Sequence, residues 1–305
     1  MQKIERGQTL MKRIFTIATA ILLVSALLMT FASCGSSDAD EEVVEVYSTE
    51  EAVYTESAVP VGKTSEEVLS YFNSLVNSVK LDKPGVSYRI EKNVPDDSLK
   101  VTKKGAEDAE EIDASLNAIN DAAKGIKDLV LEDIKETSGN INFGDDNSES
   151  LFVKGESWAS KLTAEDIDYA ALQEIGDKYF ITIAFNDLTS EEAQDVLTKA
   201  FDLRDKEEIL ASEEFAKTKE YLVLNDYDVV YSGCKITATV DRLTNEIINI
   251  NYYKAANVTA YMTGAGTLES YGDVSVMFTL EDKANYDITW DNGLPTSPVE
   301  TAEAK

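Results

Sequence analysis

The stretch from residue 221 to residue 290 constrains the fold more than any other part of the sequence, because apolar and polar residues alternate along it. Alternation with a period of two places every second side chain on the same face of a β-strand. Asn245 lies in a turn segment, where it can adopt the positive φ of a tight hairpin. Gly264 with Gly266, and residues 281–283, separate the later runs, so consecutive strands predict an antiparallel meander. The predicted strands cover residues 235–240, 247–253, 258–263, 274–280 and 284–290.

Helical periodicity is concentrated in the first half of the chain. Thr64 and Glu67 have the spacing of a capping box, and apolar residues then recur at steps of three and four as far as residue 80. A longer apolar stripe over residues 106–135 predicts the main helix of the domain. Further helices are expected over residues 189–201 and 205–218, and short strands over residues 86–90 and 179–185. The predicted class is α+β, an antiparallel β meander that can curve into a half-barrel, packed on one or two long helices.

The N-terminus has the layout of an export signal. Four basic residues and one acid occupy positions 1–13, and residues 14–31 carry no charge. Met11 is an alternative start, because it directly precedes two of the basic residues. An apolar run of this length is also compatible with an uncleaved membrane helix, and simple secretion is a third alternative.

The residues that follow the apolar run, Phe31-Ala-Ser-Cys34-Gly, resemble the lipobox of bacterial lipoproteins. This resemblance implies that residues 1–33 are removed and that Cys34 carries fatty acid such as palmitate. Buried acyl chains would then hold the protein on the outer face of the cell membrane. The resemblance departs from the usual pattern at Phe31, where the family prefers Leu.

The chain is strongly acidic, with 28 basic residues, 57 acidic residues and a net charge of −29. Binding to nucleic acid through phosphate neutralisation is therefore excluded. Residues 34–63 are acidic and lack a periodic pattern, so we expect a disordered tether between the membrane and the domain. A single domain is predicted over residues 64–294, followed by a loose tail over residues 295–305. The negative charge should keep this domain away from anionic lipid head groups.

The chain contains no histidine and two cysteines, which removes the common nucleophilic triads and zinc sites. Ser232 and Lys235 have the S-x-x-K spacing of penicillin-interacting enzymes, but the K-T-G element is missing. The pair also lies in a predicted strand, where positions i and i+3 are expected to face opposite sides. Cys234 is expected to be a small buried hydrophobe. A polar loop is predicted over residues 137–150, and its acidic residues at 145–149 do not have the spacing of a calcium loop. We therefore expect no enzymatic activity, no cofactor and no metal.

Two groups of residues leave other functions open. Acid pairs, such as Asp226 with Asp228 and Glu165 with Asp166, are compatible with a hydrolase that uses two carboxylates across a cleft. Aromatic residues are frequent in the late strands, where they suit ordinary sheet packing or a concave face that holds an apolar or sugar ligand. Tyr253 and Tyr271 belong to this aromatic group. The residues selected as candidates to face a ligand are Tyr252, Tyr261, Phe278, Tyr286 and Trp290.

Residues 153–166, 178–185 and 232–250 together resemble uncharacterised lipoproteins of Gram-positive, clostridia-type bacteria. By analogy of fold, the layout is similar to the half-barrels of lipoprotein carriers, which bind acyl chains. This resemblance brings no known activity. The missing catalytic residue sets and the expected membrane anchor favour a non-enzymatic binding or interaction module at the cell envelope, with an apolar, glycan or protein ligand. The alternatives are an acid-dependent envelope hydrolase and a purely structural envelope protein.

Overall fold

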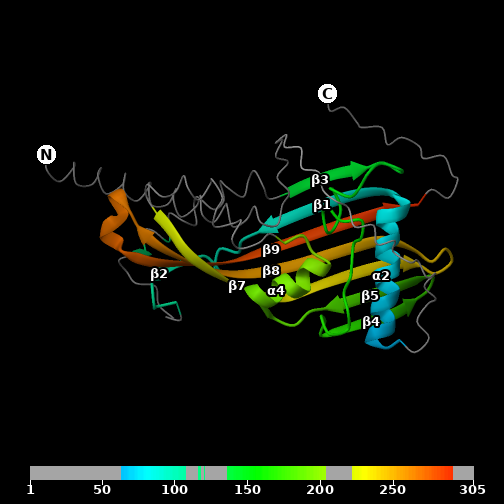
Figure 1. Cartoon of the computed structure of the whole chain (residues 1–305), viewed down its shortest axis with the longest axis horizontal. Coiled ribbons are helices and arrows are strands. Elements are labelled where there is room, and N and C mark those ends of the chain that lie inside the picture. The colour runs from blue at the N-terminus through cyan, green and yellow to red at the C-terminus, as the bar shows by residue number, and fades with distance from the viewer. Residues whose placement is uncertain (1–62, 108–115, 118–119, 121–135, 204–221, 291–305) are drawn as a thin grey trace, which may run out of the picture.

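The computed structural model describes residues 63–107, 116–117, 120, 136–203 and 222–290. Its centre is a nine-stranded antiparallel sheet in the order β3-β1-β9-β8-β7-β5-β4, in which β2 also pairs with β9 and β6 with β7 (Figure 1). The order ends at β3 and β4, so the sheet is open. The strands are β1 (Gly85–Asn93), β2 (Lys100–Lys103), β3 (Glu136–Ile141), β4 (Tyr169–Ile175), β5 (Lys178–Ala184), β6 (Leu188–Thr189), β7 (Leu222–Asp241), β8 (Glu246–Gly264) and β9 (Asp273–Thr289).

The three central strands are long, with 20 residues in β7, 19 in β8 and 17 in β9. The predicted hairpin between β7 and β8 is confirmed, and Asn245 has a φ of 58°. The break predicted at residues 281–283 is wrong, because β9 runs straight through it. The gap between the predicted strands 247–253 and 258–263 is likewise absent, since β8 is continuous. The physical reason is a pair of buried opposite charges, Lys254 and Asp282, which face each other across β8 and β9.

A β-bulge keeps the apolar residues of β7 on one face of the sheet. Tyr227 and Val229 point inward before the bulge, and Ile236 points inward after it, although their numbers have opposite parity. The register shifts between Ser232 and Lys235, where Gly233 has a φ of 61°. One extra residue in the strand restores the alternation, as a bulge does.

Two helices and the segments around them cover one face of the sheet. They are α2 (Ser65–Asp82), which crosses the strands near one end of the sheet, and the short α4 (Ser190–Val196) beside β7 (Figure 1). Both begin with a capping box, at Thr64, where the sequence predicts one, and at Thr189, where the sequence predicts the start of a helix. Apolar residues of α2, including Phe72 and Val76, pack into the same core as Ile236 and Ile250 of the sheet.

We call this side the covered face, represented by Ile236, Tyr252 and Tyr286, and the other side the open face, represented by Lys235, Tyr253 and Asp287. Most side chains on the open face are half-buried or exposed. Because successive strand residues point to opposite sides, the parity of each position decides which face its side chain occupies.

Two further predictions need correction, and one strand was missed. The expected one or two long helices are not borne out in the described ranges, where α2 has 18 residues, α4 has 7, and the 3-10 helices η3 (Leu197–Lys199) and η4 (Gly266–Tyr271) are shorter. The predicted loop at residues 137–150 begins with β3, and β4 was not predicted at all. Both are edge strands, and β3 in particular has little buried surface, so its sequence carries no clear alternation.

Several predicted segments lie mostly or entirely outside the described residues. They include the signal, Cys34 and the acidic tether, most of the helix predicted over residues 106–135, the helix over 205–218 and the tail. Asn120 belongs to the described part and donates to the carbonyl of Val101 at 3.0 Å while accepting from its backbone N–H at 2.7 Å. Within the described ranges, no helix has the length and apolarity needed to cross a membrane.

Candidate functional site

A groove of about 680 Å³ lies on the open face and extends over β1, β7, β8 and β9. Its volume is within the usual range of ligand sites, about 300–1,000 Å³. We call it the open-face groove, and its lining residues are Ser87, Tyr88, Arg89, Glu91, Lys235, Asn251, Tyr252, Tyr253, Lys283, Ala284, Asn285 and Asp287.

Strand register brings these residues together from distant parts of the chain. Tyr253 on β8 pairs with Lys235 on β7 and with Lys283 on β9, so the three side chains form one row across the open face. The next row contains Asn251, which pairs with Asn285 on β9. Rows of this kind are a direct result of antiparallel pairing, because directly opposite residues have Cβ atoms about 5 Å apart.

Side-chain amides form a hydrogen-bonded chain along the groove, which we call the amide network: Asn285, Asn251, Asn249 and the carboxylate of Asp287. Asn285 Nδ2 donates to Asn251 Oδ1 at 2.6 Å, and Asn251 Nδ2 donates to Asn249 Oδ1 at 2.6 Å. Asn249 Nδ2 then donates to Asp287 Oδ1 at 2.7 Å. Because the carboxylate can only accept, it fixes the direction of the whole chain of bonds.

Tyr253 lies at the centre of the charged row. The ammonium nitrogens of Lys235 and Lys283 are 5.6 Å and 5.7 Å from its ring centroid, within the range of a cation–π contact. Its hydroxyl donates to Glu281 Oε1 at 3.4 Å, and Lys283 Nζ lies 3.5 Å from Glu281 Oε2. Partial burial and then the nearby Glu281 carboxylate raise the pKa of Tyr253, so the hydroxyl stays protonated at neutral pH.

Arg89 forms the opposite wall of the groove and has two carboxylate partners. Its Nη2 lies 2.6 Å from Glu91 and 2.8 Å from Glu136. The hydrogen bond to Glu136, with the charges of both carboxylates, raises the pKa of Arg89 above its ordinary value. The guanidinium is thus held in place across β1 and β3.

The five aromatic residues selected from the sequence lie in different parts of the structure. Three of them, Tyr252, Phe278 and Tyr286, have side chains on the covered face with exposed fractions of 7%, 3% and 7%. Tyr252 lies among the groove-lining residues, yet its ring packs on Phe152, Phe201 and Tyr286. These three rings therefore build the core and do not face a ligand on the open side.

The two remaining selected residues also lie outside the groove. Tyr261 is on the open face further along β8, and its hydroxyl donates to Asp228 at 2.9 Å. Trp290 packs against the core and donates from Nε1 to the carbonyl of Ile247 at 2.7 Å. The groove instead contains Tyr253, which belonged to the aromatic group but was not selected. Adjacent residues in a strand point to opposite faces, and nothing in the sequence says which face is open.

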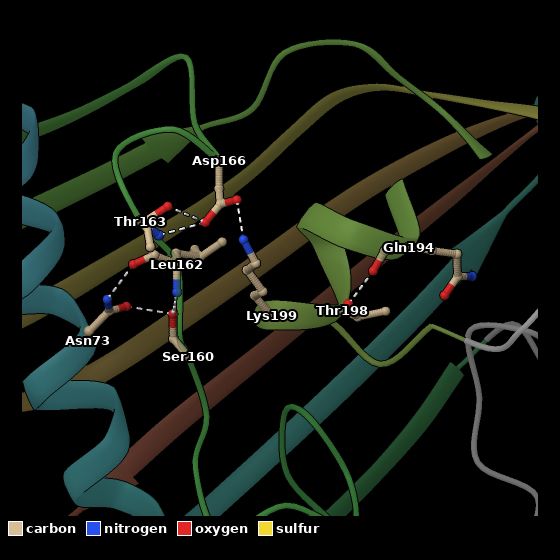
Figure 2. Close-up of polar contacts among 8 residues, drawn as sticks. All are labelled: Asn73, Ser160, Leu162, Thr163, Asp166, Gln194, Thr198 and Lys199. Carbon is tan, nitrogen blue, oxygen red and sulfur yellow. Dashed lines mark hydrogen bonds and ion pairs between the residues drawn. The ribbon is translucent and has the colours of Figure 1, made fainter. Parts of the chain in front are cut away.

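Of the acid pair Glu165 and Asp166, Asp166 is buried, and Figure 2 shows its contacts with Thr163 and Lys199. These contacts give Asp166 a structural role. Asp166 accepts from the backbone N–H and hydroxyl of Thr163, both at 2.7 Å, and from Lys199 Nζ at 2.5 Å. Burial alone would raise the pKa of Asp166, but the hydrogen bonds from Lys199 and Thr163 outweigh it and lower the pKa. Asn73 of α2 binds the same loop through Leu162 and Ser160 (Figure 2).

The other candidates for chemistry also have structural roles. Cys234 is 2% exposed, and burial raises the pKa of its thiol, as expected for a small core residue. The bulge places Ser232 and Lys235 on the same face, so the prediction that they face opposite sides is wrong. In the loop after β3, Asn147 Nδ2 donates to the carbonyl of Val79 at the end of α2. The described ranges contain no group of three side chains suited to a metal ion.

Comparison with protein-family models, with curated proteins and with solved structures gives no match for this chain. The functional inference therefore depends on the geometry of the open face. The resemblance to uncharacterised bacterial lipoproteins stays a prediction.

Proposed function

We propose that this protein is a lipid-anchored, extracytoplasmic binding module that holds a ligand in the open-face groove without catalysing a reaction. The observation that carries the proposal is the groove itself, about 680 Å³ in volume and lined by polar groups already ordered by hydrogen bonds.

The anchor in this proposal is Cys34. The basic start, the uncharged run over residues 14–31 and the small residues before Cys34 support export and acylation. Two or more acyl chains, or one chain with a second signal, are needed for stable anchoring. An acidic tether over residues 34–63 would hold the sheet away from the membrane surface.

Binding without catalysis has more support than the hydrolase alternative. A general acid needs a carboxyl group with a raised pKa. In the part of the chain that the structure describes, every carboxyl group with a clear shift has a lowered pKa. These groups are Glu107, Asp146, Asp166, Glu192, Asp241 and Glu281, and each accepts hydrogen bonds.

The anchor is tested by labelling cells with radioactive palmitate. We expect Cys34→Ala to abolish the label and release the chain into the medium. Cys234→Ala is the matched control, since it removes the only other cysteine, and it should keep both label and membrane association. Label that persists in Cys34→Ala would refute acylation at this position.

The groove is tested by native mass spectrometry of the full chain, purified from membranes in mild detergent. Asn251→Trp should fill the groove, whereas Asn257→Trp places the same side chain on the same face of β8 outside it. Aromatic residues suit strands, so both variants should fold. We expect a bound small molecule on the wild type and on Asn257→Trp, and none on Asn251→Trp. A bound mass that survives in Asn251→Trp, or one missing from all three proteins, would contradict the proposal.

A further inference from the structure

We infer that the ligand of the open-face groove is an uncharged carbohydrate chain. This inference rests on the proposed function, because it assigns a chemical class to the ligand of the same groove. Three features carry it: the amide network, the balance of charges around the groove and the carbon surface between the polar groups.

The amide network offers paired donors and acceptors in fixed orientations. Each carboxamide has two N–H donors and an oxygen with two lone pairs. The bonds among Asn285, Asn251, Asn249 and Asp287 use one donor of each amide and one lone pair of Asn251 and Asn249. Asn251 and Asn285 line the groove, so their remaining donors and acceptors are neighbours at its surface. Adjacent hydroxyls of a sugar ring donate and accept at once, so they match this pattern.

The charges around the groove are balanced by partners on the same face. Arg89 lies between Glu91 and Glu136, and Lys283 lies beside Glu281. Lys235 adds a positive charge and Asp287 a negative one. An anionic ligand would have to compete with these carboxylates and approach a chain of net charge −29. A cationic ligand would meet Lys235 and Lys283, so a neutral ligand fits best.

Carbon surface lies between the polar groups. The ring of Tyr253 and the aliphatic stems of Lys235 and Lys283 supply apolar contacts, as long cationic side chains commonly do. Sugar rings present C–H groups together with hydroxyls, which suits such a surface. An acyl chain would cover the amides of Asn251 and Asn285 without bonding to them, at a cost of desolvation.

The inference is tested by isothermal titration of the purified full chain. The probes are neutral hexasaccharides of glucose, galactose, mannose and N-acetylglucosamine, a hexamer of galacturonate, and palmitate in mixed micelles. We expect binding of at least one neutral hexasaccharide and weaker binding of galacturonate. The double variant Asn251→Ala/Asn285→Ala should bind the neutral probe at least tenfold more weakly. Asn257→Ala, on the same strand face outside the groove, should bind normally, and circular dichroism checks the fold of each variant.

Each outcome separates the chemical class from the proposed function. Tighter binding of galacturonate or palmitate, blocked by Asn251→Trp, would overturn the carbohydrate inference and leave the groove as the ligand site. Binding of a neutral hexasaccharide that neither Asn251→Trp nor the double variant weakens would overturn both the carbohydrate inference and the proposed function of the groove. The absence of binding by every neutral hexasaccharide would overturn the carbohydrate inference, and native mass spectrometry then decides whether the groove binds another class.

Discussion

At the scale of single residues, a buried pair of opposite charges, Lys254 and Asp282, joins β8 and β9 at the place where the sequence predicts a break in each strand. The exposed fractions of these residues are 7% and 8%, and Lys254 Nζ lies 3.6 Å from Asp282 Oδ2. Lys92 of β1 is the partner of Asp282 on the other side, so the carboxylate lies between two lysines in register. Charged residues on a covered face are tolerated because opposite charges compensate one another.

Removing the central charge of this group should therefore be costly. We expect Asp282→Asn to lower the free energy of unfolding by about 3 kcal/mol, because it leaves buried ammonium groups without their carboxylate. Urea denaturation measures the change. Glu281→Gln, one residue earlier and on the open face, is the matched control and should cost less than about 1 kcal/mol. Equal losses in the two variants would show that the pair does not act as a buried charge cluster.

Lys80 makes stability depend on pH in the alkaline range. Its side chain is 4% exposed and donates to the carbonyls of Ser148 and Val153. Burial lowers the pKa of Lys80 from 10.5 to about 8, although nearby carboxylates such as Glu149 act in the opposite direction. Between these two values the unfolded chain binds the proton and the folded chain does not. Stability should therefore rise as the pH rises through this window.

The measurement compares wild type with Lys80→Met in urea at pH 7 and pH 10. From pH 7 to pH 10, the free energy of unfolding of the wild type should rise by about 2 kcal/mol relative to that of the variant. Contributions from other titrating groups cancel in this difference. A difference in the free energy of unfolding that stays constant from pH 7 to pH 10 would mean that the pKa of Lys80 is not lowered in the folded protein.

At the scale of elements, the bulge in β7 keeps its two halves in one sheet. Gly233 adopts a φ of 61°, and the space around its missing Cβ is open. Gly233→Ala should therefore cost only the backbone strain of a left-handed residue, about 1 kcal/mol in urea denaturation. Deletion of Gly233 should still allow folding, because it removes the extra residue and leaves Tyr227 and Ile236 an even number of positions apart, on the same face of a regular strand. Loss of cooperative unfolding in the deletion variant would contradict this account of the bulge.

The sequence predicts elements well where local physics decides them. The capping boxes at Thr64 and Thr189 mark the starts of α2 and α4, and Asn245 marks the β7–β8 hairpin. The charged residues 281–283 predict a turn, and only tertiary pairing with Lys254 explains why β9 continues through them. The edge strand β3 has no alternating pattern because it buries little surface, so periodicity could not find it.

At the scale of the whole molecule, the candidate site follows from which face of the sheet is open. The alternating pattern predicts that Tyr252 and Tyr253 face opposite sides, but only the packing of α2 and the loops beside it shows that Tyr253 belongs to the open side. The amide network is also a product of register, since Asn251 and Asn285 are distant in the chain and opposite in the sheet. The sequence predicts a sheet rich in aromatic residues. The residues selected from it as ligand-facing include rings that belong to the core, such as Tyr252 and Tyr286.

The central claim, that the open face and not the covered face receives the ligand, is tested most directly by ¹⁹F NMR of the full chain with fluorinated tyrosine. Resonances of Tyr252, Tyr253 and Tyr286 are assigned by single substitutions to Phe, and the chain is titrated with the neutral hexasaccharide that binds best. We predict that the Tyr253 resonance shifts with the binding curve while those of Tyr252 and Tyr286 stay in place. Shifts at Tyr252 and Tyr286 without a change at Tyr253 would place the ligand on the covered face and contradict the account.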